Sequence, residues 1–480
     1  PSADRALSFS DDQLGRTLDR LFDLDRASLQ TEIVVRIIRE FHLDLKELHN
    51  DSTTVTFTGA YRKADGRTQR GQPTAAITFG NNKDHRPDLK QLLWNLTATV
   101  DGMVPIHYRV YDGQTNDSPT HWDTWTTLRE LVGRPDFLYV ADSKLCSGGV
   151  LSLVEAEGGR FLTVCPRSRK EDGLFREWVQ SHPVEWIEVE RRETSWGESD
   201  VWRMAESPIP AGDGFRLVWL WSTGMARVER EAREEVIGRA LHRVAELDKR
   251  LQSPKSRYRV AEKVRAAGER AIGPRAERWV ELGVREEATT SYHQSGPGRP
   301  GAGTKYRRVE RKRFRVEGRI RRDRLEWGGK QDGMFPLLTN CRDRSLAQLL
   351  EAYRWQPTLE KRHEQLKTVY SVAPMLLKKV TRIEGLLFVY FLALLVEALL
   401  EREVRRGMAA RGLEAIPLYP EARPCEAPTA DRVLEAFVGV SRCRLHRGGE
   451  EVQVFEPELT RIQRRLLELV GAPETIYRRA

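Results

Sequence analysis

Hydrophobic residues near the start of the chain recur at helical spacing. Leu14, Leu18 and Leu21 lie three or four residues apart, and a similar pattern extends over residues 33–41. This periodicity predicts two helices within residues 10–44. A pair of helices before a sheet either binds DNA or packs against the rest of the protein, and packing is favoured because neither helix is strongly basic.

From residue 51 the pattern changes to the alternating, β-branched type that is typical of strands. The predicted strands cover residues 51–58, 92–100, 104–111, 137–142 and 161–165, and a predicted helix covers residues 118–132. Asp101-Gly102, between the second and third strands, is typical of a tight hairpin turn. Residues 47–170 therefore follow the order β-β-β-α-β-α-β, which predicts an α/β core with a mixed sheet.

The middle of the chain has a different character, and we interpret it as an insertion. Short strand-like runs carry Trp186, Trp196, Trp202, Trp219 and Trp221. A charged helix is expected at 227–251, and a Gly-Pro loop at 296–303 precedes a basic strand. Most of these tryptophans are expected to pack in a core, because large aromatic side chains contribute most when buried.

Core character returns after the insertion, with a strand at 335–339, helices at 345–370 and 381–407, and an amphipathic helix at 458–469. The expected divisions are an N-terminal helical segment (1–46), the first part of the core (47–174), a basic, β-rich insertion (175–330), the second part of the core (331–410) and a C-terminal helical region (411–480). The chain begins at Pro1 without a methionine, so we expect that the N-terminal segment is truncated.

Composition narrows the class of protein. The 480 residues include 79 Lys and Arg against 70 Asp and Glu, a net charge of +9 that favours a polyanionic partner. The high charged fraction excludes a membrane-embedded protein, and the apolar run at 385–396 predicts a buried helix because it is too short for a bilayer. The five cysteines form no C-x-x-C pair, which argues against structural zinc and fits a reducing cytoplasm.

Three separated carboxylates are candidates for metal chemistry: Asp51, which opens a predicted strand, Asp142, which closes another, and Glu360 on a later helix. Carboxylates brought together need a cation, and magnesium prefers oxygen ligands. Bound magnesium can activate water or a hydroxyl against a phosphodiester. The alternative is that each acid is solvated or caps a helix, since the chain has 70 acids.

A second set of side chains surrounds the glutamate. Tyr353, Gln356, Glu360 and Lys367 are spaced so that one continuous helix would present them on one face. The tyrosine and lysine could hold phosphate oxygens while the glutamate holds metal. Pro357 strains a helix interior, or is the first residue of a new helix. Glu364 faces nearly the same way and is the local rival of Glu360.

These motifs resemble the DDE transposases of the insertion-sequence IS4 superfamily, most closely the IS1634-like branch. The resemblance is carried by Asn50-Asp-Ser-Thr-Thr-Val-Thr, Tyr139-Val-Ala-Asp-Ser-Lys, Tyr353-x-x-Gln-x-x-x-Glu-x-x-x-x-x-x-Lys367, Lys83-Asp-His-Arg-Pro-Asp-Leu-Lys-Gln91, Asp101-Gly-Met-Val-Pro105 with Gly113-Gln-Thr-Asn-Asp117, and Arg382-Ile-Glu-Gly-Leu-Leu387. It covers about residues 40–470 and is weakest in the insertion.

The resemblance implies an RNase H-like core interrupted by the insertion before the glutamate helix. It implies that Asp51, Asp142 and Glu360 bind two Mg²⁺ ions, which Mn²⁺ could replace. It also implies a tyrosine, an arginine and a lysine around the glutamate; Tyr353 and Lys367 match, whereas the arginine position holds Gln356. An insertion of this kind further implies that one tryptophan could stack on an extruded base.

Two basic segments are candidate DNA contacts. His85 and Arg86 lie in the Asp-His-Arg-Pro motif, where the histidine is either a polar turn residue or a phosphate or proton contact. Residues 305–324 hold eleven Lys and Arg and three acids. The expected DNA-binding residues there are Lys305, Arg307, Arg308, Arg311, Lys312 and Arg313. The alternative for that segment is a solvated edge strand whose charge prevents aggregation.

Together these features predict a bacterial DNA transposase that cuts double-stranded DNA at the terminal inverted repeats of an insertion element. The exposed 3′-OH would then be joined to target DNA in the same site. We expect a homodimer on DNA, because two ends must meet, and a cytoplasmic, nucleoid-associated protein without membrane contact. Two alternatives stay open: a catalytically retired, transposase-derived DNA-binding protein, and a sequence-nonspecific nuclease of the same fold.

Overall fold

The computed structural model describes residues 10–193, 199–253, 256–370, 372, 375, 377–447 and 450–477. The chain forms two compact units. Unit 1 combines Pro1–Val164 with Leu338–Ala480, and unit 2 comprises Cys165–Leu337. Trp196, one of the tryptophans singled out in the insertion, lies outside the described residues.

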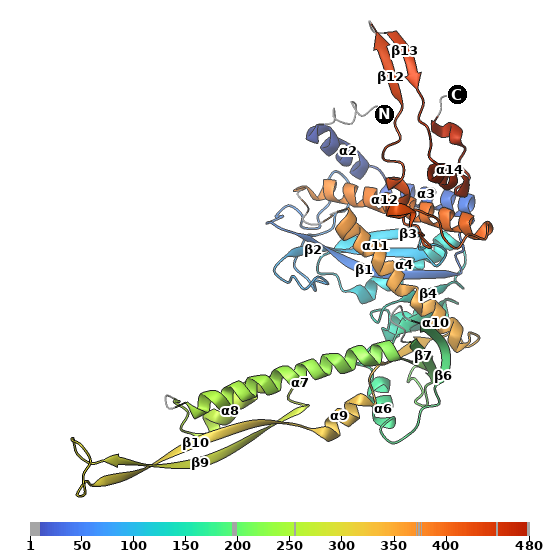
Figure 1. Ribbon diagram of the computed structural model, residues 1–480. Coiled ribbons are helices and arrows are strands. Elements are labelled where there is room, and N and C mark those ends of the chain that lie inside the picture. Colours follow the sequence, from blue (N-terminus) through green and yellow to red (C-terminus); the bar gives the residue numbers. More distant parts are fainter. Residues whose placement is uncertain are drawn as a thin grey trace. The chain divides into compact units, whose positions relative to one another are not determined.

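Unit 1 contains a mixed sheet, as the sequence predicts (Figure 1). Its strands are β1 (Glu47–Phe57), β2 (Lys90–Thr99), β3 (Pro105–Asp112), β4 (Leu138–Ala141) and β5 (Arg160–Val164), in the spatial order β3-β2-β1-β4-β5. β1, β2 and β3 pair antiparallel, whereas β4 runs parallel to both β1 and β5. β11 (Met334–Thr339) crosses into this unit, where the Thr339 hydroxyl donates to the Phe161 carbonyl. The protein is therefore of the α/β class.

The remaining elements of unit 1 are mostly helices. They are α2 (Asp11–Asp23), α3 (Arg26–Phe41), α4 (Asp117–Val132), α5 (Gly148–Ala156), α10 (Leu346–Arg354), α11 (Gln356–Glu364), the π-helical turn η1 (Gln365–Val369), α12 (Val380–Ala410), the 3₁₀ turn η2 (Pro420–Ala422), α13 (Ala430–Glu435), α14 (Arg461–Leu469) and the 3₁₀ turn η3 (Glu474–Tyr477). A hairpin of β12 (Cys443–Arg447) and β13 (Glu450–Phe455) separates α13 from α14.

α12 is the central helix of this unit. Among the described residues, it alone is long and apolar enough to cross a membrane by length and composition, but 56% of its most apolar window is buried inside the protein. Phe388 and Phe391 are fully buried, and both rings pack near Tyr108 of β3. These contacts are those of a core helix, as the short apolar run in the sequence suggests.

The two N-terminal helices form where the sequence predicts them; α2 packs on α12, whereas α3 packs on β3 and reaches α12 through an ion pair. Ser10 caps α2 through a capping box with Gln13. Asp19 of α2 pairs with Arg382 at 2.9 Å, and Arg26 of α3 pairs with Glu384 at 2.8 Å. The packing alternative therefore accounts for both helices.

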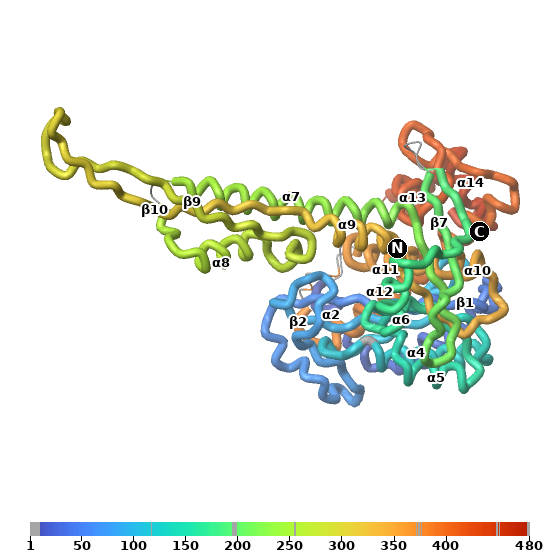
Figure 2. The backbone as a smooth tube through the Cα atoms, turned by 90° about the horizontal axis from the view of Figure 1, so that it is seen from below, coloured from blue at the N-terminus to red at the C-terminus, as the bar shows by residue number. Residues whose placement is uncertain are grey.

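Within its described residues, unit 2 holds two β structures and four helices. β6 (Ile187–Glu193), β7 (Ser199–Glu206) and β8 (Arg216–Ser222) pair antiparallel. A long hairpin of β9 (Val280–Gln294) and β10 (Tyr306–Ile320) packs against α7 (Thr223–Gln252) and α8 (Ala261–Ile272) around a buried apolar cluster. The helices α6 (Lys170–Trp178) and α9 (Arg322–Gly329) complete the unit. The far ends of β9 and β10 extend beyond both helices (Figure 2).

Several local predictions are wrong. Asp51 lies within β1, not at its start, because β1 begins at Glu47. The helix expected at 345–370 is divided into α10, α11 and η1, with Pro357 in the first turn of α11. The basic strand is shorter than residues 305–324, since α9 begins at Arg322. The β12–β13 hairpin was not predicted.

Candidate functional site

Strand pairing brings two of the predicted acids to neighbouring positions. Asn50 of β1 pairs with Ala141 of β4 in a parallel register. Asp51 directly follows Asn50, and Asp142 directly follows Ala141. Adjacent strands lie roughly 4.8 Å apart, and side chains in equal register point to the same face. The sheet therefore brings these two carboxylates together where β4 ends.

α11 carries Glu360 to the same neighbourhood. The Gln356 amide donates to the Asn50 carbonyl at 3.0 Å, and its oxygen lies 3.3 Å from His49 Nδ1. This buried contact attaches the first turn of α11 to β1 beside Asp51. Glu360 follows one turn later. Burial and the nearby charge of Asp51 raise the pKa of Glu360 above its ordinary value.

Asp51 has two nitrogen-bearing neighbours that the sequence analysis did not place in the site. His363 Nε2 lies 3.5 Å from Asp51 Oδ2, and Lys83 Nζ lies 3.8 Å from Asp51 Oδ1. Burial acts to raise the pKa of Asp51, but His363 and Lys83 outweigh it and hold that pKa below its ordinary value. His363 lies three residues after Glu360 on α11, and Lys83 is the first residue of the Lys83–Gln91 motif. These positions in the sequence could have indicated that both residues belong to the site.

Asp142 is the more open of the two aspartates, with a side chain 40% exposed. Its Oδ1 accepts from the Lys144 backbone at 3.0 Å and lies 3.9 Å from His121 Nε2. Nδ1 of the same histidine is 3.1 Å from the Tyr139 hydroxyl. Burial raises the pKa of Tyr139, and the charges of Tyr111 and Asp142 act in the same direction. The carboxylate of Asp142 is therefore held by the Lys144 backbone and lies near a buried histidine, and its side chain reaches solvent.

The residues expected around the glutamate are divided among α10, α11 and η1. Tyr353 belongs to α10, and burial together with the charge of Glu360 raises its pKa to about 12. Gln356 is buried and engaged with β1, which leaves it no surface for DNA. Lys367 lies in η1, and its ammonium donates to Asp84 at 2.6 Å. α10 ends at Arg354 and α11 begins at Gln356 with Pro357 in its first turn, so the alternative that Pro357 lies at the start of a new helix is confirmed.

A turn at residues 82–86 brings further polar groups to this region. The Asn82 side chain accepts from the backbone of Asp84 and of Arg86 and so fixes the turn. His85 adopts a left-handed conformation and is exposed, as is Arg86, which pairs with Asp88. Within one turn, the chain thus directs Lys83 to β1 and Asp84 to η1.

No group of three or more His, Cys, Asp or Glu side chains among the described residues is arranged to hold a metal ion. The three predicted acids are nonetheless in one region. Asp51 neighbours Asp142 in the sheet, and the charge of Asp51 raises the pKa of Glu360. Their donor atoms are carboxylate oxygens, the ligands that Mg²⁺ prefers. Metal binding at this site would require these side chains to move closer.

The basic hairpin of unit 2 carries both paired and unpaired basic side chains, which alternate along β10. Arg315 contacts Asp248 at 3.0 Å, Lys312 contacts Glu286 at 2.6 Å, and Arg308 pairs with Glu310. Within the described part of the chain, ion pairs are not formed by the side chains of Lys305, Arg307, Arg311 and Arg313. These four side chains therefore present uncompensated positive charge along the hairpin, from Lys305 before β10 to Arg313 in its middle.

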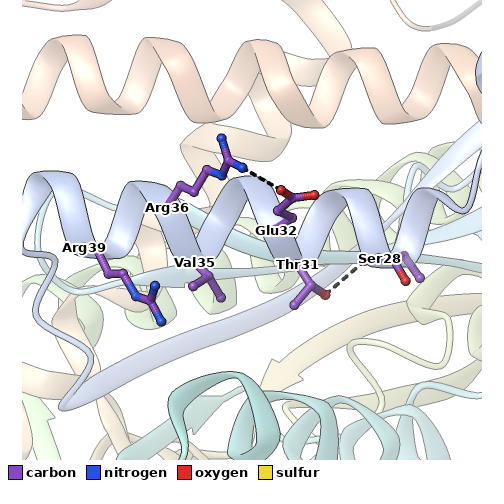
Figure 3. Close-up of a pocket in the computed structure, with 7 residues that line it drawn as sticks. Ser28, Thr31, Glu32, Val35, Arg36 and Arg39 are labelled. Carbon is purple, nitrogen blue, oxygen red and sulfur yellow. Dashed lines mark hydrogen bonds and ion pairs between the residues drawn. The ribbon is translucent and has the colours of Figure 1, made fainter.

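A depression along α3 is separate from these features (Figure 3). It has a volume of about 600 Å³ and is lined by residues of this helix alone, among them Thr31, Glu32 and Arg39. Glu32 and Arg36 pair across one turn at 2.7 Å. Because its lining includes none of the acids described above, we do not assign it to the site.

Comparison with known proteins does not identify the chain: no family model matches it, and no curated protein matches it.

Proposed function

We propose that this chain is a DNA-cleaving enzyme of the DDE type, a transposase that cuts at the ends of an insertion element and transfers the resulting 3′-OH to target DNA. The observation that carries the proposal is the parallel register that sets Asp51 beside Asp142, with α11 attached to β1 so that Glu360 lies within electrostatic reach of Asp51.

An RNase H-like core is the second part of the proposal. The mixed sheet in the order β3-β2-β1-β4-β5 supports it, with its antiparallel β1, β2 and β3 and its parallel β1, β4 and β5. The strand and helix order of residues 47–164 agrees with the one that the sequence predicts. In the same proposal, unit 2 interrupts the core between β5 and the helix that carries Glu360.

Asp51, Asp142 and Glu360 would hold two Mg²⁺ ions, or Mn²⁺ in their place. Bound there, the ions would supply an activated water or hydroxyl and stabilise the leaving oxygen. The chain's own residues orient the acids: Gln356 fixes α11, His363 contacts Asp51, and the Lys144 amide contacts Asp142. Phosphoryl transfer depends chiefly on such positioning and on charge neutralisation.

DNA would be held by basic side chains of both units. The uncompensated basic side chains of the β9–β10 hairpin provide phosphate contacts that need no particular base sequence. His85 and Arg86 are exposed on the turn beside the acids and provide others. In this proposal two chains act together on two DNA ends, in the bacterial cytoplasm at the nucleoid.

Substitution of Asp51 by Asn tests the proposal. With Mg²⁺ and a duplex containing the terminal repeats that flank the coding gene, we expect Asp51→Asn to abolish cleavage while leaving the DNA dissociation constant within about threefold, because a neutral isostere removes a metal ligand and no DNA contact. Glu364→Gln, an exposed acid on α11, is the matched control and should cleave normally.

The outcome separates the alternatives. Binding without cleavage by the unsubstituted protein would favour a retired DNA-binding protein. Equal cleavage of unrelated duplexes would favour a general nuclease. Unimpaired cleavage by Asp51→Asn would exclude the proposed catalytic site.

A further inference from the structure

Lys83 places an ammonium group among the acidic side chains of unit 1. Its Nζ lies 3.8 Å from Asp51 Oδ1 and donates to the Ser52 hydroxyl at 2.8 Å and to the Ser52 carbonyl. Burial and the charge of Asp51 raise the pKa of Glu360, whereas the charge of Lys83 acts to lower it. The ammonium is thus fixed to the β1 segment that contains Asp51. Its charge lowers the pKa of both Asp51 and Glu360.

Two of the side chains expected to contact DNA beside Glu360 are engaged with other groups of the protein. Lys367 donates to Asp84, and the buried amide of Gln356 bonds to β1. The side chain of Lys83 is 31% exposed, and its ammonium is held beside Asp51. A group with these properties can meet a ligand that approaches the carboxylates from solvent.

We propose that Lys83 binds a non-bridging oxygen of the DNA phosphate that lies over Asp51. This inference rests on the proposed function, since it takes DNA as the ligand. An ammonium beside the carboxylates attracts the negative charge of a phosphate diester, in addition to any cation that the carboxylates hold. Lysine binds phosphate as a compact charge with three N–H donors. The contacts to Ser52 limit the rotation of Lys83 and so favour one position for the phosphate.

The test compares Lys83→Met, Lys83→Arg and the control Lys90→Met, which removes an ammonium that donates to the Ala60 carbonyl. With Mg²⁺ and terminal-repeat DNA in single-turnover cleavage, Lys83→Met should be slower by about 100-fold, the typical effect of losing one donor to a developing negative charge. Lys83→Arg should recover most of the rate, and Lys90→Met should match the unsubstituted protein.

A binding measurement tests the same contact without cleavage. In Ca²⁺, the slope of log affinity against log salt concentration should be smaller by about 0.9 for Lys83→Met, as expected for one lost phosphate contact. This readout keeps the two proposals apart: if the unsubstituted protein does not cleave but the slope changes, the contact of Lys83 is supported and the proposed catalysis fails.

Two results would overturn the inference. One is a Lys83→Met variant with the cleavage rate and salt slope of Lys90→Met. The other is loss of Mn²⁺ binding by Lys83→Met, measured by electron paramagnetic resonance, because that would show that Lys83 maintains the arrangement of the acids instead of binding DNA. We expect Mn²⁺ to bind equally or more tightly once the competing ammonium is removed.

Discussion

Gln356 shows how a single buried amide can position an acid that lies elsewhere on its helix. Its nitrogen donates to the Asn50 carbonyl, and its oxygen lies within hydrogen-bond distance of His49. Asn50 is itself held by the Asn95 and Thr97 side chains of β2. A chain of polar contacts therefore connects the centre of the sheet to the helix that carries Glu360.

Replacement of Gln356 by Leu should weaken both folding and cleavage. The variant leaves the Asn50 carbonyl without its side-chain donor in a buried place, so we expect the free energy of unfolding to fall by about 1–3 kcal/mol. Because α11 loses its attachment beside Asp51, cleavage should fall more than DNA affinity. Urea denaturation and single-turnover cleavage measure the two effects, with exposed Glu364→Gln as the control; a fully stable and active variant would contradict this role.

The division between α10 and α11 explains why the arrangement of residues around Glu360 was only partly predictable from the sequence. Spacings of three, seven and fourteen residues indicate one face only if the helix is continuous. α10 ends at Arg354, Pro357 lies in the first turn of the next helix, and a π-helical turn begins at Gln365. Pro357 signals the first break. Local pattern gives no comparable signal for the π turn, which results from tertiary packing.

In the β9–β10 hairpin, the side chains that we expect to bind DNA lie on one face of β10. Arg307, Arg311 and Arg313 occupy alternate positions of β10, so their side chains point to the same side. A two-stranded ribbon of this kind fits the major groove of DNA. We therefore expect these three arginines to contribute phosphate contacts, whereas Arg315 and Arg319 on the same face are occupied by acidic partners.

The triple variant Arg307→Gln, Arg311→Gln, Arg313→Gln should reduce the salt slope of DNA binding by about 2.7, at about 0.9 per phosphate contact. The double variant Arg315→Gln, Arg319→Gln is the matched control and should change the slope little. Both are measured by titration of a duplex at several salt concentrations. Equal slopes for the two variants would place the DNA contacts of the protein outside this part of the hairpin.

At the scale of the whole molecule, the periodicity of hydrophobic residues is sufficient to predict the class and the approximate bounds of the strands β1 to β5, because these depend on local pattern. It also predicts that Asp142 follows a buried strand. It does not predict the contacts of Lys83 and His363 with Asp51, because a turn and a helix far apart in the sequence supply them. Such contacts depend on strand register and helix docking, and a single sequence encodes these only indirectly.

A buried histidine in the core should make the stability of the folded protein sensitive to mild acid. His107 of β3 is buried, and burial together with the charge of Arg109 lowers its pKa from 6.5 to about 4. Between these values the unfolded chain binds a proton that the folded chain does not, so stability falls as the pH decreases. The contribution reaches roughly 3 kcal/mol near pH 4, at about 1.4 kcal/mol for each pKa unit. Above pH 6.5 it is absent.

Substitution of His107 by Leu should therefore flatten the dependence of stability on pH between pH 6.5 and 4, whatever the change in absolute stability. Urea denaturation followed by tryptophan fluorescence at a series of pH values measures this slope. His446→Leu is the control, because His446 lies exposed on β12 and should leave the slope as it is in the unsubstituted protein. If His107→Leu keeps that slope as well, His107 must take up its proton equally in the folded and unfolded chain, and the acid sensitivity must arise from the carboxylates that lose their ion pairs.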